Sequence, residues 1–176
     1  MKSFILTSLV LCLGVVAAFA NDKAEAKAVD IVKALGGKIE YGQGSQSRKV
    51  VKVDLSGTNV TNGDLRHLIG LKELRDLDLS GAAISDGTQY IGFMKKLETL
   101  DVSGTKVDDN ALIKLRGLKN LKSISIAQTT VTDAGLQILG KISTLRDVSV
   151  ADSRVTESGK SEVLKVNPNL RFSDAE

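Results

Sequence analysis

Residues 97–120 read LETLDVSGTKVDDNALIKLRGLKN, and the same pattern returns along most of the chain. The stretch has two parts: an alternating apolar segment that ends in a Ser-Gly-Thr turn, and a segment with leucines at helical spacing. The apolar positions are Leu97, Leu100 and Val102 in the first part and Leu112, Leu115 and Leu118 in the second. Each unit therefore predicts a short strand and a return helix, which together form one coil of a solenoid.

Five such coils follow one another over residues 49–169. Their first apolar positions are Val50, Leu74, Leu97, Leu121 and Leu145. Within each predicted strand the apolar residues alternate, so one side chain enters the core and the next faces outward. Residues 170–172 open a sixth strand that is not continued, and we expect residues 170–176 to form a C-terminal cap stub and tail, with Phe172 covering the end of the core.

The segment before the coils predicts an N-terminal cap over residues 21–48. Residues 22–35 are rich in helix formers and are followed by two glycines, residues 38–41 read as a short strand, and residues 42–47 read as a loop. A solenoid needs an end cap, because its first coil would otherwise leave the apolar core open to water.

Residues 1–20 have the pattern of a secretory signal peptide. Lys2 precedes a mostly apolar run over residues 4–16, and Ala18-Phe19-Ala20 is a small-x-small cleavage site. The alternative is an uncleaved membrane anchor, since the run approaches the roughly 18 residues that can span a bilayer. We expect cleavage after Ala20, a secreted or periplasmic mature chain, and no stable membrane insertion after cleavage.

The composition excludes several kinds of site from the mature chain. The only cysteine, Cys12, lies in the predicted leader, so disulfides, thiolate metal ligands and a cysteine nucleophile are excluded after cleavage. Removing Lys2 lowers the formal charge from +3 to +2, no run of Lys or Arg suggests a nucleic-acid stripe, and aromatic stacking residues are scarce. We expect no nucleic acid and no cofactor to bind.

Three residues after the last apolar position of each strand lies a short, usually hydroxylated residue. These residues are Thr58, Ala82, Thr105, Thr129 and Ser153. With the LDLSGT-like motif around them, the pattern resembles the leucine-rich repeat family in a bacterial Thr-type (planctomycete-like) form with repeats of about 24 residues. The commonest form of the family carries Asn at this position, so the chain departs from it there. The resemblance covers about residues 28–172. It implies an α/β leucine-rich repeat solenoid, with a short curved parallel sheet inside and short helices outside.

One residue in each coil is placed to cap the following helix with its side-chain oxygen. These residues are Thr61, Ser85, Asp108, Thr132 and Thr156. The residue after each cap is Asn62, Asp86, Asp109, Asp133 or Glu157, of which four are acidic, and the helix dipole favours a negative charge there. We interpret these acids as capping groups and not as catalytic carboxylates.

The outward strand residues of successive coils form rows on the inner face, about 4.8 Å apart. The first predicted row is Lys52, Asp76, Thr99, Ser123 and Asp147, and the second is Asp54, Asp78, Asp101, Ser125 and Ser149. The resemblance implies that family members bind proteins through this face, which makes these ten residues the candidate protein-binding site. Neither row contains the Trp, Tyr or Arg that dominate binding hot spots.

Asp54, Asp78 and Asp101 form an acidic strip within the second row. Like charges at this spacing repel, which would raise the pKa of one carboxyl or favour a cation held between them. Calcium prefers roughly six to eight oxygen ligands, which a flat ladder of aspartates supplies poorly. We therefore expect no metal site, and either a surface that attracts a basic protein or a solvated face.

The second coil is one residue short and contains Tyr90 and Phe93. In one interpretation Ile91 and Met94 fill the usual leucine positions and an aromatic side chain covers the gap. In the other, the aromatic residues form an exposed patch on the outer side that docks a partner.

The sequence offers no catalytic constellation. His67 is the lone histidine, on an outer helix, and the serines of the LSG turns have no histidine near them to act as base. The sequence thus predicts a non-catalytic protein-binding module that is exported from the cytoplasm. The alternative is a self-associating structural protein of the cell envelope.

Overall fold

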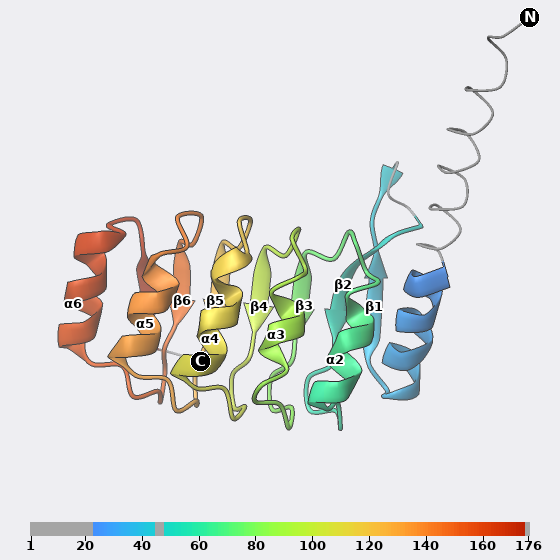
Figure 1. Ribbon diagram of the computed structural model, residues 1–176, viewed down its shortest axis with the longest axis horizontal. Helices are drawn as coiled ribbons and strands as arrows, with labels where there is room; N and C mark the ends of the chain where they lie inside the picture. Colours follow the sequence, from blue (N-terminus) through green and yellow to red (C-terminus); the bar gives the residue numbers. More distant parts are fainter. Residues whose placement is uncertain (1–22, 45–47, 175–176) are drawn as a thin grey trace, which may run out of the picture.

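The computed structural model describes residues 23–44 and 48–174, and the predicted leader over residues 1–20 lies outside them. The described chain forms two layers, a seven-stranded sheet and a row of short helices (Figure 1). The strands are β1 (Lys38–Tyr41), β2 (Val50–Asp54), β3 (Asp76–Asp78), β4 (Thr99–Asp101), β5 (Ser123–Ser125), β6 (Asp147–Ser149) and β7 (Arg171–Ser173). The helices are an N-terminal helix (residues 23–34), α2 (Asn62–Leu68), α3 (Thr88–Ile91), α4 (Asp109–Ile113), the 3-10 helix η2 (Lys114–Gly117), α5 (Asp133–Gly140) and α6 (Glu157–Val166). Within the described ranges, no helix is long and apolar enough to cross a membrane.

The sheet confirms the predicted solenoid. Its strands lie in chain order, and each of the pairs from β2–β3 to β6–β7 is parallel. Parallel neighbours need a crossover connection, and here the helix of each coil supplies it. β1 is the exception, because it pairs antiparallel with β2 and places Ile39 opposite Val53.

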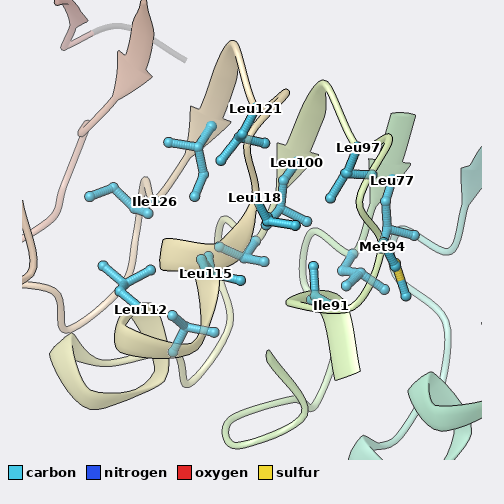
Figure 2. Packing of buried hydrophobic residues seen from close by; sticks show 14 of the residues in the cluster. Leu77, Ile91, Met94, Leu97, Leu100, Leu112, Leu115, Leu118, Leu121 and Ile126 are labelled. Carbon is cyan, nitrogen blue, oxygen red and sulfur yellow. The ribbon is translucent and has the colours of Figure 1, made fainter. Parts of the chain in front are cut away.

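The core lies between the sheet and the helices. Each strand from β2 to β6 contributes a buried central residue, such as Leu77 or Leu100. In the central coils, buried side chains of the helical segments, such as Ile91 and Leu112, lie on the side that faces the strands (Figure 2). In the short second coil, α3 has four residues, and Ile91 and Met94 are both buried, as the first interpretation of that coil predicts. Tyr90 packs partly buried against the core, whereas Phe93 is 63% exposed.

The hydroxyl residue that follows the last apolar position of a strand segment makes hydrogen bonds to the backbone of the turn. Thr105 is buried, and its hydroxyl donates a hydrogen bond of 2.6 Å to the carbonyl oxygen of Val102. The hydroxyl oxygen of Thr105 also accepts the Val107 backbone N–H at 3.4 Å. Thr129 and Ser153 make the equivalent bonds to Ile126 and Val150. A short hydroxyl side chain therefore adds hydrogen bonds to backbone groups of the turn in these coils. The second coil has Ala82 at this position, and there the backbone N–H of Ala82 donates to the Leu79 carbonyl oxygen at 3.1 Å.

Four of the five predicted residues occupy the N-cap position of a helix, and the prediction for Ser85 is wrong. The side-chain oxygens of Asp108, Thr132 and Thr156 accept a helix N–H, whereas the N–H and hydroxyl of Thr61 donate to the Asp64 carboxylate. Thr61, Asp108, Thr132 and Thr156 are the N-cap residues of α2, α4, α5 and α6. The N-cap of α3 is Gly87, with no side-chain hydrogen bond. Because this coil is one residue short, its helix starts later relative to the turn. The backbone N–H of Ser85 instead donates to Asn62 Oδ1 at 3.0 Å.

Besides interacting favourably with the helix dipole, the acid after the N-cap of α4 and of α5 accepts hydrogen bonds from the next coil. Asp109 accepts hydrogen bonds from the backbone N–H of Thr132 at 2.8 Å and from its hydroxyl at 2.6 Å. Asp133 accepts the same pair from Thr156, both at 2.7 Å. These bonds tie the N-termini of α5 and α6 to the helices before them, in addition to the packing of the core.

Glycines make room for these inter-coil bonds. A Cβ at Gly159 would clash with the Asp133 side chain, and one at Gly135 would clash with Asp109. The third coil has Ala111 at the equivalent helix position, and the side chain of the preceding acid, Asp86, is exposed there. Gly135 and Gly159 therefore face the acids that bond to the next coil, because a side chain at either position would clash with the carboxylate.

Both ends of the described solenoid are covered. At the N-terminal end, the first helix buries Ala28 and Val32 in the core, and the buried Glu25 carboxylate accepts the Val50 backbone N–H at 3.0 Å. At the C-terminal end, Phe172 packs partly buried against the core. The ammonium of the buried Lys160 pairs with Asp174 at 2.5 Å, which ties α6 to the residue after β7.

Candidate functional site

The strand register brings the ten candidate residues together on one face of the sheet. Opposed Cα partners run in one row through Lys52, Asp76, Thr99, Ser123 and Asp147, and in a second row through Asp54, Asp78, Asp101, Ser125 and Ser149. The ten residues are half-buried or exposed, whereas the strand residues between the rows, such as Leu100, are buried. The two predicted rows therefore exist as a continuous inner face.

Each aspartate of the acidic strip is held by the turn that follows its own strand. Asp78 Oδ1 accepts the backbone N–H of Ser80 at 2.9 Å and its hydroxyl at 2.7 Å. Asp101 binds Ser103 in the same way, at 2.8 Å and 2.6 Å. One carboxylate oxygen is thus committed to the turn. The aspartate of the repeated Asp-x-Ser pattern therefore has a structural role as well as a position on the surface.

The expected rise in the pKa of one strip carboxyl is not observed at Asp54. The hydroxyl and backbone N–H of Ser56 donate to Asp54 Oδ1 at 2.6 Å and 3.0 Å. These bonds, with a smaller contribution from Lys38 at 3.2 Å, lower the pKa of Asp54 to about 2. For Asp54 the prediction is wrong, because it counted repulsion between neighbouring carboxylates and omitted the donors of the turn, which stabilise the charged form.

Ion pairs divide the inner face into two balanced ends and an acidic centre. At one end, Lys52 pairs with Glu40 at 2.9 Å and Asp54 with Lys38. At the other end, Asp147 pairs with Arg171 at 2.8 Å. The three central acids, by contrast, have no Lys or Arg within ion-pair distance among the described residues. These acids are Asp76, Asp78 and Asp101.

Beside this acidic centre the face is hollowed. A shallow cavity of about 490 Å³ is lined by Asp101 and, beyond it, by small or uncharged side chains. They are Ser103, Ser125, Ala127, Gln128, Ser149 and Ser173. The hollow exists because serine and alanine occupy the outward positions of the later coils, where the earlier coils carry aspartate.

The described residues hold no group of three or more His, Cys, Asp or Glu placed to bind a metal ion. His67 lies half-exposed in α2, on the opposite layer from the inner face, and its Nε2 accepts a hydrogen bond of 3.1 Å from Arg66. Partial burial, which disfavours the charged imidazolium, is the main reason that the pKa of His67 lies below its ordinary value. The histidine is therefore not next to any serine of the inner face.

Comparison with known proteins places the fold in a recognised class. A family model described as Leucine Rich repeat matches residues 93–115. The leucine-rich repeat ectodomain of the receptor kinase SOBIR1 from Arabidopsis thaliana is similar, with a TM-score of 0.54, 19% identity, and coverage of 85% of this chain and 90% of that one. A leucine-rich repeat protein of Leptospira interrogans is similar over 61% of this chain, with a TM-score of 0.51 and 19% identity. The PEPR1 chain in the PEPR1-AtPEP1 structure matches 76% of this chain at 19% identity and a TM-score of 0.49. No curated protein matches the sequence significantly.

The described residues have the fold of a leucine-rich repeat solenoid, and one repeat matches the family model. The matched stretch runs from the end of the second coil through β4 to the helical segment of the third, and the parallel sheet with outer helices extends the same unit along the described residues. The chain spans 19% of the PEPR1 chain and 27% of the Leptospira protein.

Proposed function

We propose that this chain is a non-catalytic recognition module that binds a protein through the inner face of its sheet. The observation that carries the proposal is the strand register, which aligns ten exposed or half-buried side chains in two rows across five parallel strands. Such a surface is broad and open, and these properties fit a protein better than a small molecule, which needs an enclosing pocket. The use of the same fold in a receptor ectodomain supports this proposal.

The charge of the face points to a basic partner. Asp76, Asp78 and Asp101 have one sign of charge and no cation close enough to form an ion pair within the described chain. A Lys or Arg of a partner would supply the missing charge, and complementarity of this kind speeds association and selects among partners. The hollow beside Asp101 has room for a bulky side chain next to that basic residue.

The proposal includes the organisation of the whole chain. Residues 1–20 act as a signal peptide, residues 21–48 as the N-terminal cap, residues 49–169 as the five repeats and residues 170–176 as the C-terminal stub and tail. With this organisation, the exported chain binds its partner in the periplasm or outside the cell. The burial of Ala28 and Val32 beneath the first coil supports the capping role of the N-terminal segment.

A pull-down from cell-envelope extract tests the site. The bait is compared with a variant in which Asp54, Asp78 and Asp101 are replaced by Asn. Asn keeps a side-chain oxygen for the Ser N–H of each turn, so the loops should stay folded while the negative charge is lost. A charge-matched control replaces three exposed acids outside the two rows, Asp30, Asp86 and Asp152, by Asn.

The expected result is a protein captured by the wild type and by the control but not by the inner-face variant. Capture that persists in all three proteins would refute a role for the acidic centre. If the bait captured only copies of itself, and its mass in solution rose with concentration, the chain would be a self-associating envelope protein instead.

A further inference from the structure

The helical side of the solenoid carries a surface unlike the inner face. It consists of the exposed aromatic ring of Phe93 and five exposed cations on neighbouring coils. We call it the basic patch, and its cations are Lys72, Lys95, Lys114, Arg116 and Lys119. We infer that the basic patch binds the surface of an anionic lipid bilayer, with Phe93 entering the interface and the cations contacting the headgroups.

The fold brings the cations together from three coils. Lys72, Lys95 and Lys119 each lie four residues before strand positions that are register partners, namely Asp76, Thr99 and Ser123. They therefore occupy the same place in successive coils. The other two cations belong to η2, which lies beside α3.

The backbone that presents Phe93 is tightly held. Gly92, just before it, packs so closely on the Lys114 carbonyl oxygen that no Cβ would fit between them. The Lys95 ammonium donates to the Gly92 carbonyl oxygen at 2.7 Å and lies 6.0 Å from the centre of the Phe93 ring. Phe93 is thus presented from a fixed turn with a cation at its side, and ordering the loop adds little to the cost of binding.

The charge of the patch is not cancelled by its own chain. Residues 65–72, 87–96 and 111–119 contain no Asp or Glu. Two of the acids that flank them are engaged elsewhere, since Glu73 pairs with Lys96 at 2.6 Å and Glu98 pairs with Arg75 at 2.7 Å. None of the five patch cations forms an ion pair with a carboxylate of the described residues, whereas Lys38, Lys52 and Lys122 of the sheet side all do.

The kind of cation favours a bilayer over an acidic protein. Four of the five are lysines, which are depleted in protein–protein interfaces. In the two coils that contain Phe93 and η2, the exposed large apolar side chains among the described residues are only Phe93 and Ile113. Protein hot spots are normally packed clusters. A fluid anionic surface needs no complementary shape, and it gains from each long cationic side chain and from one inserted ring.

The chain contains no tryptophan, so a single Phe93→Trp substitution gives a reporter at the centre of the patch. Fluorescence is recorded with vesicles of pure phosphatidylcholine and with vesicles of equimolar phosphatidylcholine and phosphatidylglycerol. The matched control is Thr99→Trp, at an exposed position of the inner face. Both are made in the full chain, so any contribution of the apolar residues 4–16 is common to the two proteins.

We expect the F93W emission to shift to shorter wavelength with anionic vesicles only, while T99W does not respond. Replacing Lys114, Arg116 and Lys119 by Gln in the F93W protein should lower the apparent partition coefficient about 100-fold, at about fivefold for each cation. High salt should weaken binding in the same direction. The inference would be overturned if the emission wavelength of F93W did not change on adding vesicles, or if it changed equally with neutral and with anionic vesicles. A response to polyglutamate without one to vesicles would overturn it in favour of an acidic protein.

Discussion

Gly159→Ala tests whether the acid that reaches across coils contributes to stability. In a helix, Gly→Ala normally stabilises, because alanine restricts the unfolded chain and has the higher helix propensity, by about 1 kcal/mol. At Gly159 the new Cβ would instead clash with the carboxylate, Cγ and Cβ of Asp133. To admit it, the Asp133 side chain must leave Thr156, from which it accepts two hydrogen bonds of 2.7 Å.

The magnitude follows from these two effects. Hydrogen bonds to a charged group contribute about 1.5–3 kcal/mol each, and the exposure of this pair places them at or below the lower end, so their loss should cost about 2–3 kcal/mol. The gain in helix propensity offsets about 1 kcal/mol of this cost. We therefore expect G159A to lower the free energy of unfolding by about 1–2 kcal/mol, measured as a lower midpoint of urea unfolding followed by circular dichroism.

Two controls make the result specific. A Cβ at Gly63, in the first turn of α2, would meet only the Thr61 hydroxyl at 3.6 Å, so G63A should be neutral or stabilising. In a D133G background the obstructing side chain is gone, and G159A should then become stabilising. The reasoning would be refuted if G159A and G63A behaved alike, or if the effect of G159A were the same with and without Asp133.

Three further substitutions test other parts of the fold. Leu100→Ala should open a cavity in the central coil, because Leu100 is fully buried, and should cost about 2–5 kcal/mol in urea unfolding; an unchanged midpoint would contradict the strand register. Thr105→Val should cost about 1–2 kcal/mol, because the Val102 carbonyl oxygen loses its buried hydroxyl donor, while T105S, which keeps the hydroxyl, should cost clearly less. Asp54→Asn should lower stability by about 1 kcal/mol near neutral pH. Its folded pKa of about 2 lies below the ordinary 3.8, so its contribution is present above that ordinary value and is lost as the pH falls through about 2. Unfolding curves of D54N and wild type should therefore converge in strong acid, and a constant difference at all pH values would reject this account.

The sequence alone was sufficient for the architecture, because the fold is nearly one-dimensional. Each coil must bury the same set of apolar positions, so the repeat spacing of 23–25 residues is enough to place Leu77, Leu100 and Ile124 in register. The same periodicity predicted which strand residues face outward. The ten candidate residues thus appear on the inner face in the predicted order.

Contacts between coils could not be derived in this way. The low pKa of Asp54 depends on which donors lie within about 3 Å of its carboxylate, and the repeat pattern does not specify that. The wrong cap prediction at Ser85 has another cause, since it applied the regular repeat to a coil that is one residue short. The pairing of Asp109 and Asp133 with the next coil was likewise missed, although the glycine at the facing helix position of that next coil, as at Gly135, was a usable signal.

The sequence by itself determined the strand and helix of each coil, the core and the two rows of the inner face, since all of these follow from local periodicity. Only the tertiary structure decided how charge is distributed over the molecule. Whether a cation is neutralised depends on the distance to acids from other coils: Lys122 meets Glu98, whereas Lys114 and Lys119 have no such neighbour in the described chain. Side-chain ion pairing is a property of the stacked coils, and it is what separates the acidic inner face from the basic patch around Phe93.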